Sequence, residues 1–311
     1  MTENSSSWER GVIEKLALEA LREQRRARRW GIFFKALTFA YLTFLLILLL
    51  DLRRTDAFAG KHSALVDVAG VIDAKGGASA DNINSALLSA FKDKNTQGII
   101  LRVNSPGGSP VQAGIIYDEI RRLRDLYPNI PMYAVVEDVC ASGGYYIASA
   151  ADKIYVDKAS LIGSIGVLMD QFGFVDTLEK LGVERRVLSA GENKAFLDPF
   201  SPLEPRHVDH AKALLGEIHQ QFIEVVRKGR GKRLKESPEL FSGLIWTGTK
   251  SIELGLTDGL GSVDYVAREV IKAEQVVDYT QKENIAERFA KRFGAGVAQT
   301  LGLGTAAPRL R

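Results

Sequence analysis

Two short motifs carry residues that could perform nucleophilic chemistry together. Ser142 lies in the segment Ala-Ser-Gly-Gly at 141–144, and Lys194 ends the segment Gly-Glu-Asn-Lys at 191–194, fifty-two residues later. A serine hydroxyl attacks poorly unless a base takes its proton. A lysine can be that base when burial destabilises its ammonium, although its ordinary pKa of about 10.4 keeps it protonated at neutral pH. The pair therefore predicts a serine nucleophile activated by a lysine.

Taken singly, each of these residues has a commoner explanation. A serine directly before a helix is usually an N-cap, and most lysines are solvated. The residues around Lys194 are mostly small or apolar, which favours its burial against a partner. Cys140, the single cysteine, lies two residues before Ser142 and follows the apolar run 132–136. We interpret Cys140 as a buried packing residue rather than a second nucleophile.

A second glycine-rich segment could bind the charge that such a reaction develops. Asn104-Ser105-Pro106-Gly107-Gly108 follows a predicted strand at 98–103 and precedes a predicted helix at 111–127. Ligand sites in open α/β sheets concentrate at the carboxyl ends of strands. Paired glycines let a substrate approach the backbone and leave amide hydrogens directed at it. On this motif alone, a tight strand-to-helix turn stays an equal interpretation.

The elements that must position these motifs alternate along the chain. Short apolar strands are predicted at 65–72, 98–103, 132–136, 154–156, 165–169 and 185–189. Helices are predicted at 82–91, 111–127, from 143, at 174–181 and at 205–228. Such alternation is typical of a parallel sheet covered on both faces, so the predicted fold class is α/β.

An apolar stretch near the N-terminus predicts one transmembrane helix. Residues 32–50 contain a single charge, Lys35, and are long enough to cross a bilayer. Five arginines lie within the ten residues before it, which places the N-terminus in the cytoplasm and the rest of the chain outside. The segment Ala57-Phe58-Ala59 resembles a signal cleavage site, but intervening charges favour a permanent anchor.

The predicted organisation has five parts. They are a basic cytoplasmic arm at 1–30, a transmembrane signal anchor at 31–50, a linker at 51–62, a globular domain at 63–275 and an amphipathic tail at 276–311. The 41 basic and 38 acidic residues nearly balance, which gives no reason to expect nucleic acid as a partner. His207, His210 and His219 are interpreted as helix-surface residues, and we predict no metal or cofactor.

Six motifs in order resemble the short form of the signal peptide peptidase A, or protease IV, family. They are Asn-Ser-Pro-Gly-Gly, Ala-Ser-Gly-Gly-Tyr-Tyr, Gly-Ser-Ile-Gly-Val at 163–167, Gly-Glu-Asn-Lys, Trp-Thr-Gly at 246–248 and Gly-Leu-Thr-Asp-Gly-Leu-Gly at 255–261. The resemblance runs from about residue 63 to 272. It implies a crotonase or Clp protease-like α/β fold of repeated ββα units and a serine endopeptidase with a Ser/Lys dyad.

The resemblance also implies roles, partners and a location. Ser142 would be the nucleophile, Lys194 the general base, Gly108 and Gly143 the oxyanion-hole donors, and Ser164 the residue that orients the lysine. The expected substrates are apolar peptides such as cleaved signal peptides. The chain would be a homo-oligomer in which neighbouring copies help to complete the active sites. It would contact membrane lipid in the cell inner membrane, with its catalytic domain on the periplasmic or extracytoplasmic side.

Two other functional classes stay open. A non-catalytic membrane scaffold or chaperone on a protease fold would retain the glycines but would not need Ser142 together with Lys194. A crotonase-type acyl-CoA enzyme would need neither Lys194 nor an extracytoplasmic domain.

Overall fold

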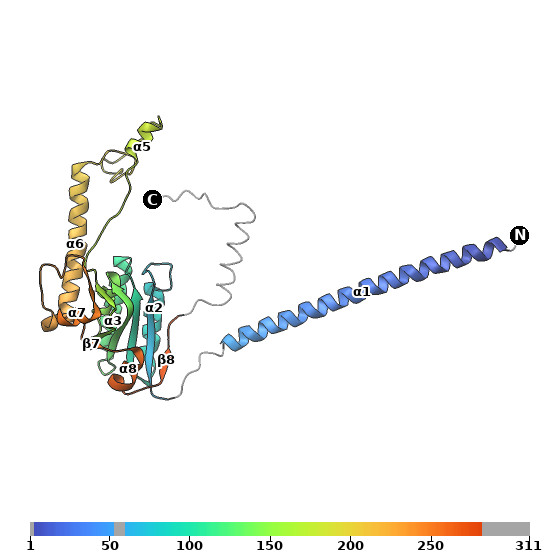
Figure 1. The fold of residues 1–311 in the computed structure, drawn as a ribbon, viewed down its shortest axis with the longest axis horizontal. Coiled ribbons are helices and arrows are strands. Elements are labelled where there is room, and N and C mark those ends of the chain that lie inside the picture. Colours follow the sequence, from blue (N-terminus) through green and yellow to red (C-terminus); the bar gives the residue numbers. More distant parts are fainter. Residues whose placement is uncertain (1–2, 53–59, 282–311) are drawn as a thin grey trace. The chain divides into compact units, whose positions relative to one another are not determined.

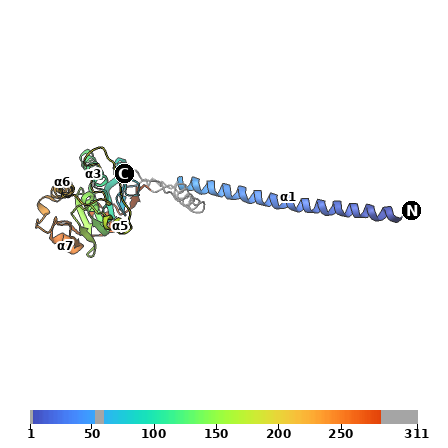
Figure 2. The same cartoon turned by 90° about the horizontal axis from the view of Figure 1, so that it is seen from above.

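The computed structural model describes residues 3–52 and 60–281, which belong to two compact units, 1–58 and 59–311. The described part of the first unit is one uninterrupted helix, α1 (Glu3–Leu52), visible in Figures 1 and 2. Its segment Leu21–Ile47 is long and apolar enough to cross a membrane. Twenty-seven helical residues span about 40 Å, more than a hydrocarbon core needs. The predicted cytoplasmic segment at 1–30 and the predicted anchor at 31–50 thus belong to one helix, which is compatible with a membrane anchor.

Threonine hydroxyl groups in the apolar half of α1 form hydrogen bonds within the helix itself. Thr38 Oγ1 donates to the carbonyl of Phe34, and Thr43 Oγ1 donates to that of Phe39, both over 2.8 Å. A polar group in hydrocarbon is costly without such a partner. Most of the predicted linker, residues 53–59, lies outside the described residues.

The second unit is built on one eight-stranded sheet. Its strands are β1 (His62–Ala69), β2 (Thr96–Ser105), β3 (Met132–Ala141), β4 (Lys153–Val156), β5 (Leu161–Gly163), β6 (Ile245–Thr247), β7 (Gly259–Leu260) and β8 (Val276–Asp278). The main order is β6-β5-β3-β2-β1-β8, and β4 pairs with β3 and β7 beside that path. The pairs are parallel except for β5 with β6. The predicted α/β class is confirmed.

Helices and helical turns follow most of these strands. They are α2 (Ala80–Lys92), α3 (Pro110–Leu126), α4 (Gly143–Ala148), α5 (Val175–Lys180), α6 (Pro205–Arg230), η1 (Gly231–Arg233), α7 (Gly248–Glu253), α8 (Val263–Tyr265) and the short π-helix η2 (Val266–Ile271). Proline at the first position of α3 and of α6 suits a helix start, because no intrahelical bond is lost there.

Both faces of the sheet are buried, as the apolar strands predicted. Successive side chains of a strand point to opposite faces. Val66 and Leu101 pack in the large cluster that includes α2, α3 and α4, whereas their neighbours Leu65 and Ile100 pack in a second cluster with Val266 of η2. The sheet is therefore a rigid base for the loops at its edges.

Strand β3 changes its partner partway along its length. Tyr133 to Val135 pair with β4, and Val139 to Ala141 pair with β5. Between these stretches the register with β2 shifts, so that two residues after Val103 face four residues of β3. A bulge of this kind bends a strand and redirects the residues that follow it. The bend leads directly into Ser142 and α4.

Two predicted strands, 165–169 and 185–189, are wrong. Both belong to a segment at 164–204, called here the arm, whose only regular element is α5. Figure 1 shows α5 at the end of α6 opposite to α7. Leu168 is 81% exposed and Leu188 is fully exposed, so the apolar pattern of the arm is not buried within one chain.

The sheet also extends beyond the predicted globular range of 63–275. Residues Val276–Asp278 form β8, which pairs with β1, although the prediction placed them in the tail. The amphipathic part of the predicted tail, from 282 onward, lies outside the described residues.

Candidate active site

Ser142 lies between β3 and α4, at the N-cap position, but it does not cap the helix. Its side chain makes no cap hydrogen bond. By contrast, the hydroxyls of Ser79, Ser109 and Ser262 each accept an amide hydrogen at the start of their helices. Among the described residues the Ser142 hydroxyl has no hydrogen-bond partner, so the simple capping interpretation does not account for it.

The backbone of Ser142 has an unusual conformation that its neighbours hold in place. Its φ is 52° and its ψ is −123°, a region that residues with a side chain rarely adopt. Its amide donates to the carbonyl of Gly163 over 2.8 Å. A Cβ on Gly107, where φ is +100°, would lie only 2.7 Å from the Ser142 Cβ. The turn at Gly107 is therefore packed directly against the nucleophile candidate.

Gly108 and Gly143, the predicted oxyanion-hole residues, both lie close to Ser142. The amide of Ile72 donates to Gly107 O over 2.9 Å, and Ser109 donates to Ile72 O over 2.8 Å. Because peptide groups alternate in extended backbone, the intervening amide of Gly108 points away from Ile72. Gly143 is the first residue of α4, so its amide has no partner within the helix.

Gly143 and Gly108 are close neighbours in space. A Cβ on Gly143 would lie 3.4 Å from the nitrogen of Gly108. A Cβ on Gly108 itself would lie 2.1 Å from the carbonyl oxygen of Ile72, so no other residue fits there without displacing the bridge. Backbone amides beside a serine are the kind of donor that stabilises an oxyanion during acyl transfer.

Ser164 lies in the same neighbourhood. It follows Gly163, the residue whose carbonyl holds the Ser142 amide, and its own amide donates to Leu244 O over 2.8 Å. Its φ of 49° is again in the left-handed region. The structure therefore brings together Ser142, Gly143, Gly108 and Ser164 from the sequence prediction.

Lys194 is not brought to this group within one chain. Its side chain is exposed, and its amine makes no hydrogen bond or ion pair with any described residue. The turn that carries it packs on the start of α6, where Asn193 Oδ1 lies 3.3 Å from His207 Nε2. Helix α4 meets α6 much further along, where Tyr146 and Phe222 have ring centroids 5.2 Å apart. Fifteen helical residues separate His207 from Phe222, about 22 Å along α6.

The turn of Lys194 is nevertheless well defined by its neighbours. Asp198 forms an ion pair with Arg185 and accepts from Ser201 Oγ over 2.6 Å. The hydrogen bond from Arg185 lowers the pKa of Asp198 below its ordinary value, despite some desolvation. The Arg185 guanidinium also lies 5.1 Å from the centre of the Phe200 ring. These contacts support Lys194 on a turn that is ordered but has no partner for the amine.

Two other candidate groups are engaged elsewhere. Cys140 is fully buried, and burial raises the pKa of its thiol far above its ordinary value, which disfavours a reactive thiolate. His219 Nε2 lies 3.1 Å from Ile165 O, and His207 lies against Asn193. Among residues 3–52 and 60–281, no cluster of three or more metal-binding side chains occurs.

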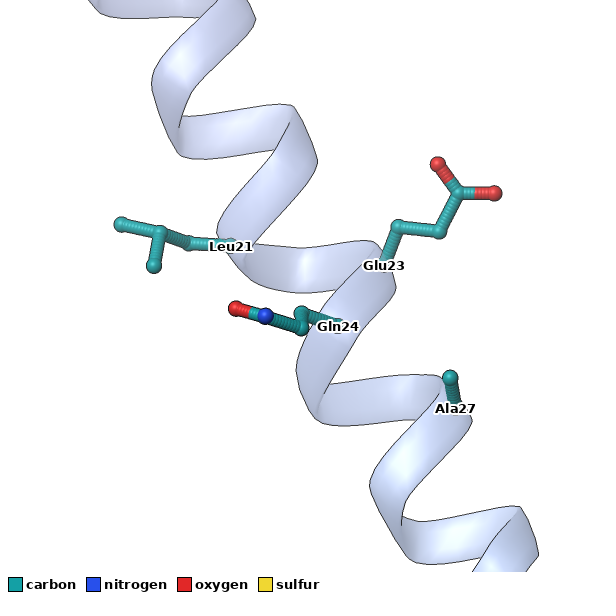
Figure 3. Close-up of a pocket in the computed structure, with 4 residues that line it drawn as sticks. All are labelled: Leu21, Glu23, Gln24 and Ala27. Atoms are coloured by element: carbon teal, nitrogen blue, oxygen red, sulfur yellow. The ribbon is translucent and has the colours of Figure 1, made fainter.

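A shallow depression on α1 is not an enclosed site. Its lining residues Leu21, Glu23, Gln24 and Ala27 all come from this one helix, as Figure 3 shows. Ligand sites usually need walls from several elements.

Two contributors to the site were not predicted from the sequence. The carbonyl of Gly163 holds the Ser142 amide, and Ile72 fixes the turn at Gly107 and Gly108. Gly163 begins one of the six motifs, so a signal for it was present. Ile72 gives none, because it forms an isolated bridge to a residue thirty-six positions away.

Comparison with known proteins agrees with this geometry. Residues 124–277 match the model for peptidase family S49. A Synechocystis protein named "Putative protease slr0021" is 33% identical over 189 residues, 60% of this chain and 67% of that protein. An Enterococcus faecium protein named "Putative signal peptide peptidase SppA" is 30% identical over 225 residues, 71% of this chain and 65% of that protein.

Greater identity occurs with a protein of a different name. A Brucella melitensis protein named "Na(+)/H(+) antiporter NhaA" is 50% identical over 176 residues, 56% of this chain. The chain spans only 24% of that protein's length. The S49 match includes the turn of Ser142 and ends within β8, and it is consistent with the protease relatives. The chain belongs to peptidase family S49.

Proposed function

We propose that this chain is a membrane-anchored serine endopeptidase in which Ser142 is the nucleophile and Lys194 the general base. The observation that carries the proposal is Ser142, uncapped and with a positive φ, beside the backbone amides of Gly108 and Gly143. A scaffold protein has no use for a serine that neither caps a helix nor binds another group. The protease relatives support the same class of reaction.

In the proposed reaction, the Ser142 hydroxyl attacks the scissile carbonyl carbon and transfers its proton to the Lys194 amine. The carbonyl oxygen becomes an oxyanion that accepts hydrogen bonds from Gly108 and Gly143, each worth about 3 kcal/mol in the transition state. The protonated amine then gives its proton to the leaving nitrogen, and the peptide bond breaks. Water hydrolyses the resulting acyl-enzyme by the same steps, and Ser142 is regenerated.

Lys194 is proposed to reach Ser142 from a neighbouring copy of the chain. The amine is exposed and distant from Ser142 in one chain, and the arm that carries it exposes many large apolar side chains. These are Leu168, Met169, Phe172, Phe174, Leu181, Val183, Val187, Leu188, Phe200 and Leu203. Exposed apolar surface of this extent favours association. Burial at such an interface would also favour the neutral amine, the form that can accept a proton. Ser164, beside Ser142, is proposed to orient the incoming amine.

The sequence of α1 supports a proposed location and substrate class. The arginine-rich start of the candidate span favours a cytoplasmic N-terminus, with the peptidase unit on the other side of the inner membrane. An anchored peptidase meets peptides released from or left in the bilayer. We propose that its substrates are extended apolar peptides such as cleaved signal peptides.

The test uses the full chain in detergent with casein and a synthetic signal peptide. The wild type should cleave both substrates, and Ser142→Ala and Lys194→Ala should each lower kcat by at least about 10⁴-fold with unchanged melting temperature. Lys180→Ala, which alters an exposed lysine on α5 of the same arm, should retain activity. Full activity in either dyad variant would sink the proposed mechanism.

The proposed orientation needs a separate measurement. Protease added outside spheroplasts should digest the chain beyond residue 60, while the N-terminal residues 1–30 should stay protected. Protection of the peptidase unit would reverse the orientation without affecting the chemistry.

A further inference from the structure

We propose that Ser105 is a positioning residue that sets the spacing between the two oxyanion donors. Ser105 is the last residue of β2 and is completely buried. Its Oγ accepts a hydrogen bond from the amide of Gly107 over 3.1 Å. The inference rests on the proposed function, because it concerns the geometry of the same acyl-transfer site.

The bond to Gly107 controls the direction of the Gly108 amide. The carbonyl of Gly107 and the amide of Gly108 belong to one planar peptide group. Ile72 holds this group from the carbonyl side. Ser105 holds the residue from its other end, at the Gly107 amide. With both ends of Gly107 fixed, the Gly108 N–H has one direction, although glycine alone would permit many.

The other side of Ser105 lies against the helix that carries the second donor. A Cβ on Gly144 would lie 3.1 Å from Ser105 O, 3.3 Å from Ser105 Cβ and 3.6 Å from Ser105 Oγ. Gly144 directly follows Gly143, and Gly107 directly precedes Gly108, so Ser105 contacts the neighbour of each proposed donor. Ser105 pairs in register with Cys140 of β3, which fixes it to the strand that leads into Ser142.

The contacts of Ser105 therefore join three parts of the site: the Pro-Gly-Gly turn, the start of α4 and the strand before the nucleophile. A purely structural role would lower stability alone. A positioning role lowers kcat. A small displacement of a donor weakens its hydrogen bond to the transition state more than it weakens the binding of the substrate.

The experiment compares Ser105→Ala with Ser79→Ala in the full chain. Both changes remove a buried hydroxyl that accepts one backbone amide hydrogen, and Ser79 caps α2. Ser105→Ala should lower kcat by about 10- to 100-fold with KM within about twofold, and should slow labelling of Ser142 by a fluorophosphonate to the same degree. Ser79→Ala should lower the melting temperature and leave kcat within about twofold.

A second variant tests the same spacing from the helix side. Gly144→Ala presses a methyl group against Ser105 and should also lower kcat without raising KM. It answers the question if Ser105→Ala does not fold.

The outcomes separate this inference from the proposed function. An unchanged kcat in Ser105→Ala, or a loss that matches only its loss of folded protein, would overturn the positioning role while Ser142 remained the nucleophile. Activity that survives in Ser142→Ala would instead remove the proposed function, whatever Ser105 does.

Discussion

The turn around Ser142 and the arm around Lys194 are built in opposite ways. Ser142 is held by a carbonyl of β5, by the close approach of Gly107, where an added Cβ would lie 2.7 Å from the Ser142 Cβ, and by a buried core behind α4. Lys194 is ordered by Asp198 and its partners, but the amine and much of the apolar surface around it face outward. The surroundings of the proposed nucleophile are assembled within one chain, whereas the amine of the proposed base has no partner among the described residues.

This difference is energetic as well as geometric. Full burial of one leucine or phenylalanine side chain stabilises a structure by about 1.5–3 kcal/mol. The arm leaves several such side chains exposed, so it gains most from contact with another molecule. A division of the dyad between copies would make catalysis depend on assembly.

The largest expected effect comes from mixing two inactive variants. Ser142→Ala and Lys194→Met should each lose about 10⁴- to 10⁶-fold in kcat. Co-expression of the two, with a different affinity tag on each, should restore about a quarter to a half of wild-type activity, since random assembly pairs an intact serine with an intact neighbouring lysine at one site in four and double purification removes complexes of a single variant. Peptide cleavage by doubly purified complexes measures this. No recovery in mixed complexes would place both residues of the dyad in one chain.

Alanine substitutions at two glycines, Gly108 and Gly114, test the surroundings of Ser142. Gly108→Ala should lower kcat by about 10²- to 10³-fold, because its Cβ would lie 2.1 Å from Ile72 O and would displace an oxyanion donor. Gly114→Ala in α3 has open space around its Cβ and should be active and equally or more stable. Cleavage assays with melting curves distinguish the two. Equal behaviour of both variants would contradict the assignment of Gly108.

Charged side chains placed on the arm at 164–204 should disrupt the proposed contact between copies of the chain. The double change Leu168→Asp with Leu188→Asp alters two side chains that are exposed in one chain, so folding should be retained. Assembly should weaken, and activity should fall about tenfold or more, as judged by sedimentation velocity in detergent and by cleavage. Leu126→Asp, on the exposed end of α3, is the control and should keep both assembly and activity.

The smallest effect is expected at Cys140. Burial raises the pKa of this thiol, which keeps it protonated at neutral pH. Cys140→Ala should therefore keep kcat within about twofold and lose about 1 kcal/mol of folding free energy from the small cavity it creates. Loss of activity on thiol alkylation of the native enzyme, absent from this variant, would be inconsistent with a packing role.

The sequence predicted the elements whose patterns are decided within one chain. Helix α6 and the buried strands β2 and β3 were predicted from periodicity and apolar runs alone. The apolar runs at 165–169 and 185–189 were assigned to strands because such a pattern reports burial but does not say in which molecule. The bulge in β3 left no trace, because Glu137 and Asp138 look like ordinary polar residues in the sequence.

The residue types of the candidate site were predictable from the sequence, but their backbone conformations and their distances from one another were not. Glycines at 107, 108 and 143 could be recognised from their motifs, and the structure brings Gly108 and Gly143 together. The absence of a cap at Ser142 depends on backbone angles that no residue type prescribes. The distance between Ser142 and Lys194 depends on how the arm leaves the sheet, which local patterns do not encode.

The left-handed backbone of Ser142 implies a trade-off between durability and activity. Glycine adopts such a conformation freely, whereas a residue with a side chain costs about 1–3 kcal/mol there. Ser142→Gly should therefore raise the melting temperature of the enzyme while removing its nucleophile. A chain optimised for stability alone would carry glycine at this position. The fold retains backbone strain at Ser142, whose hydroxyl group the proposed reaction requires.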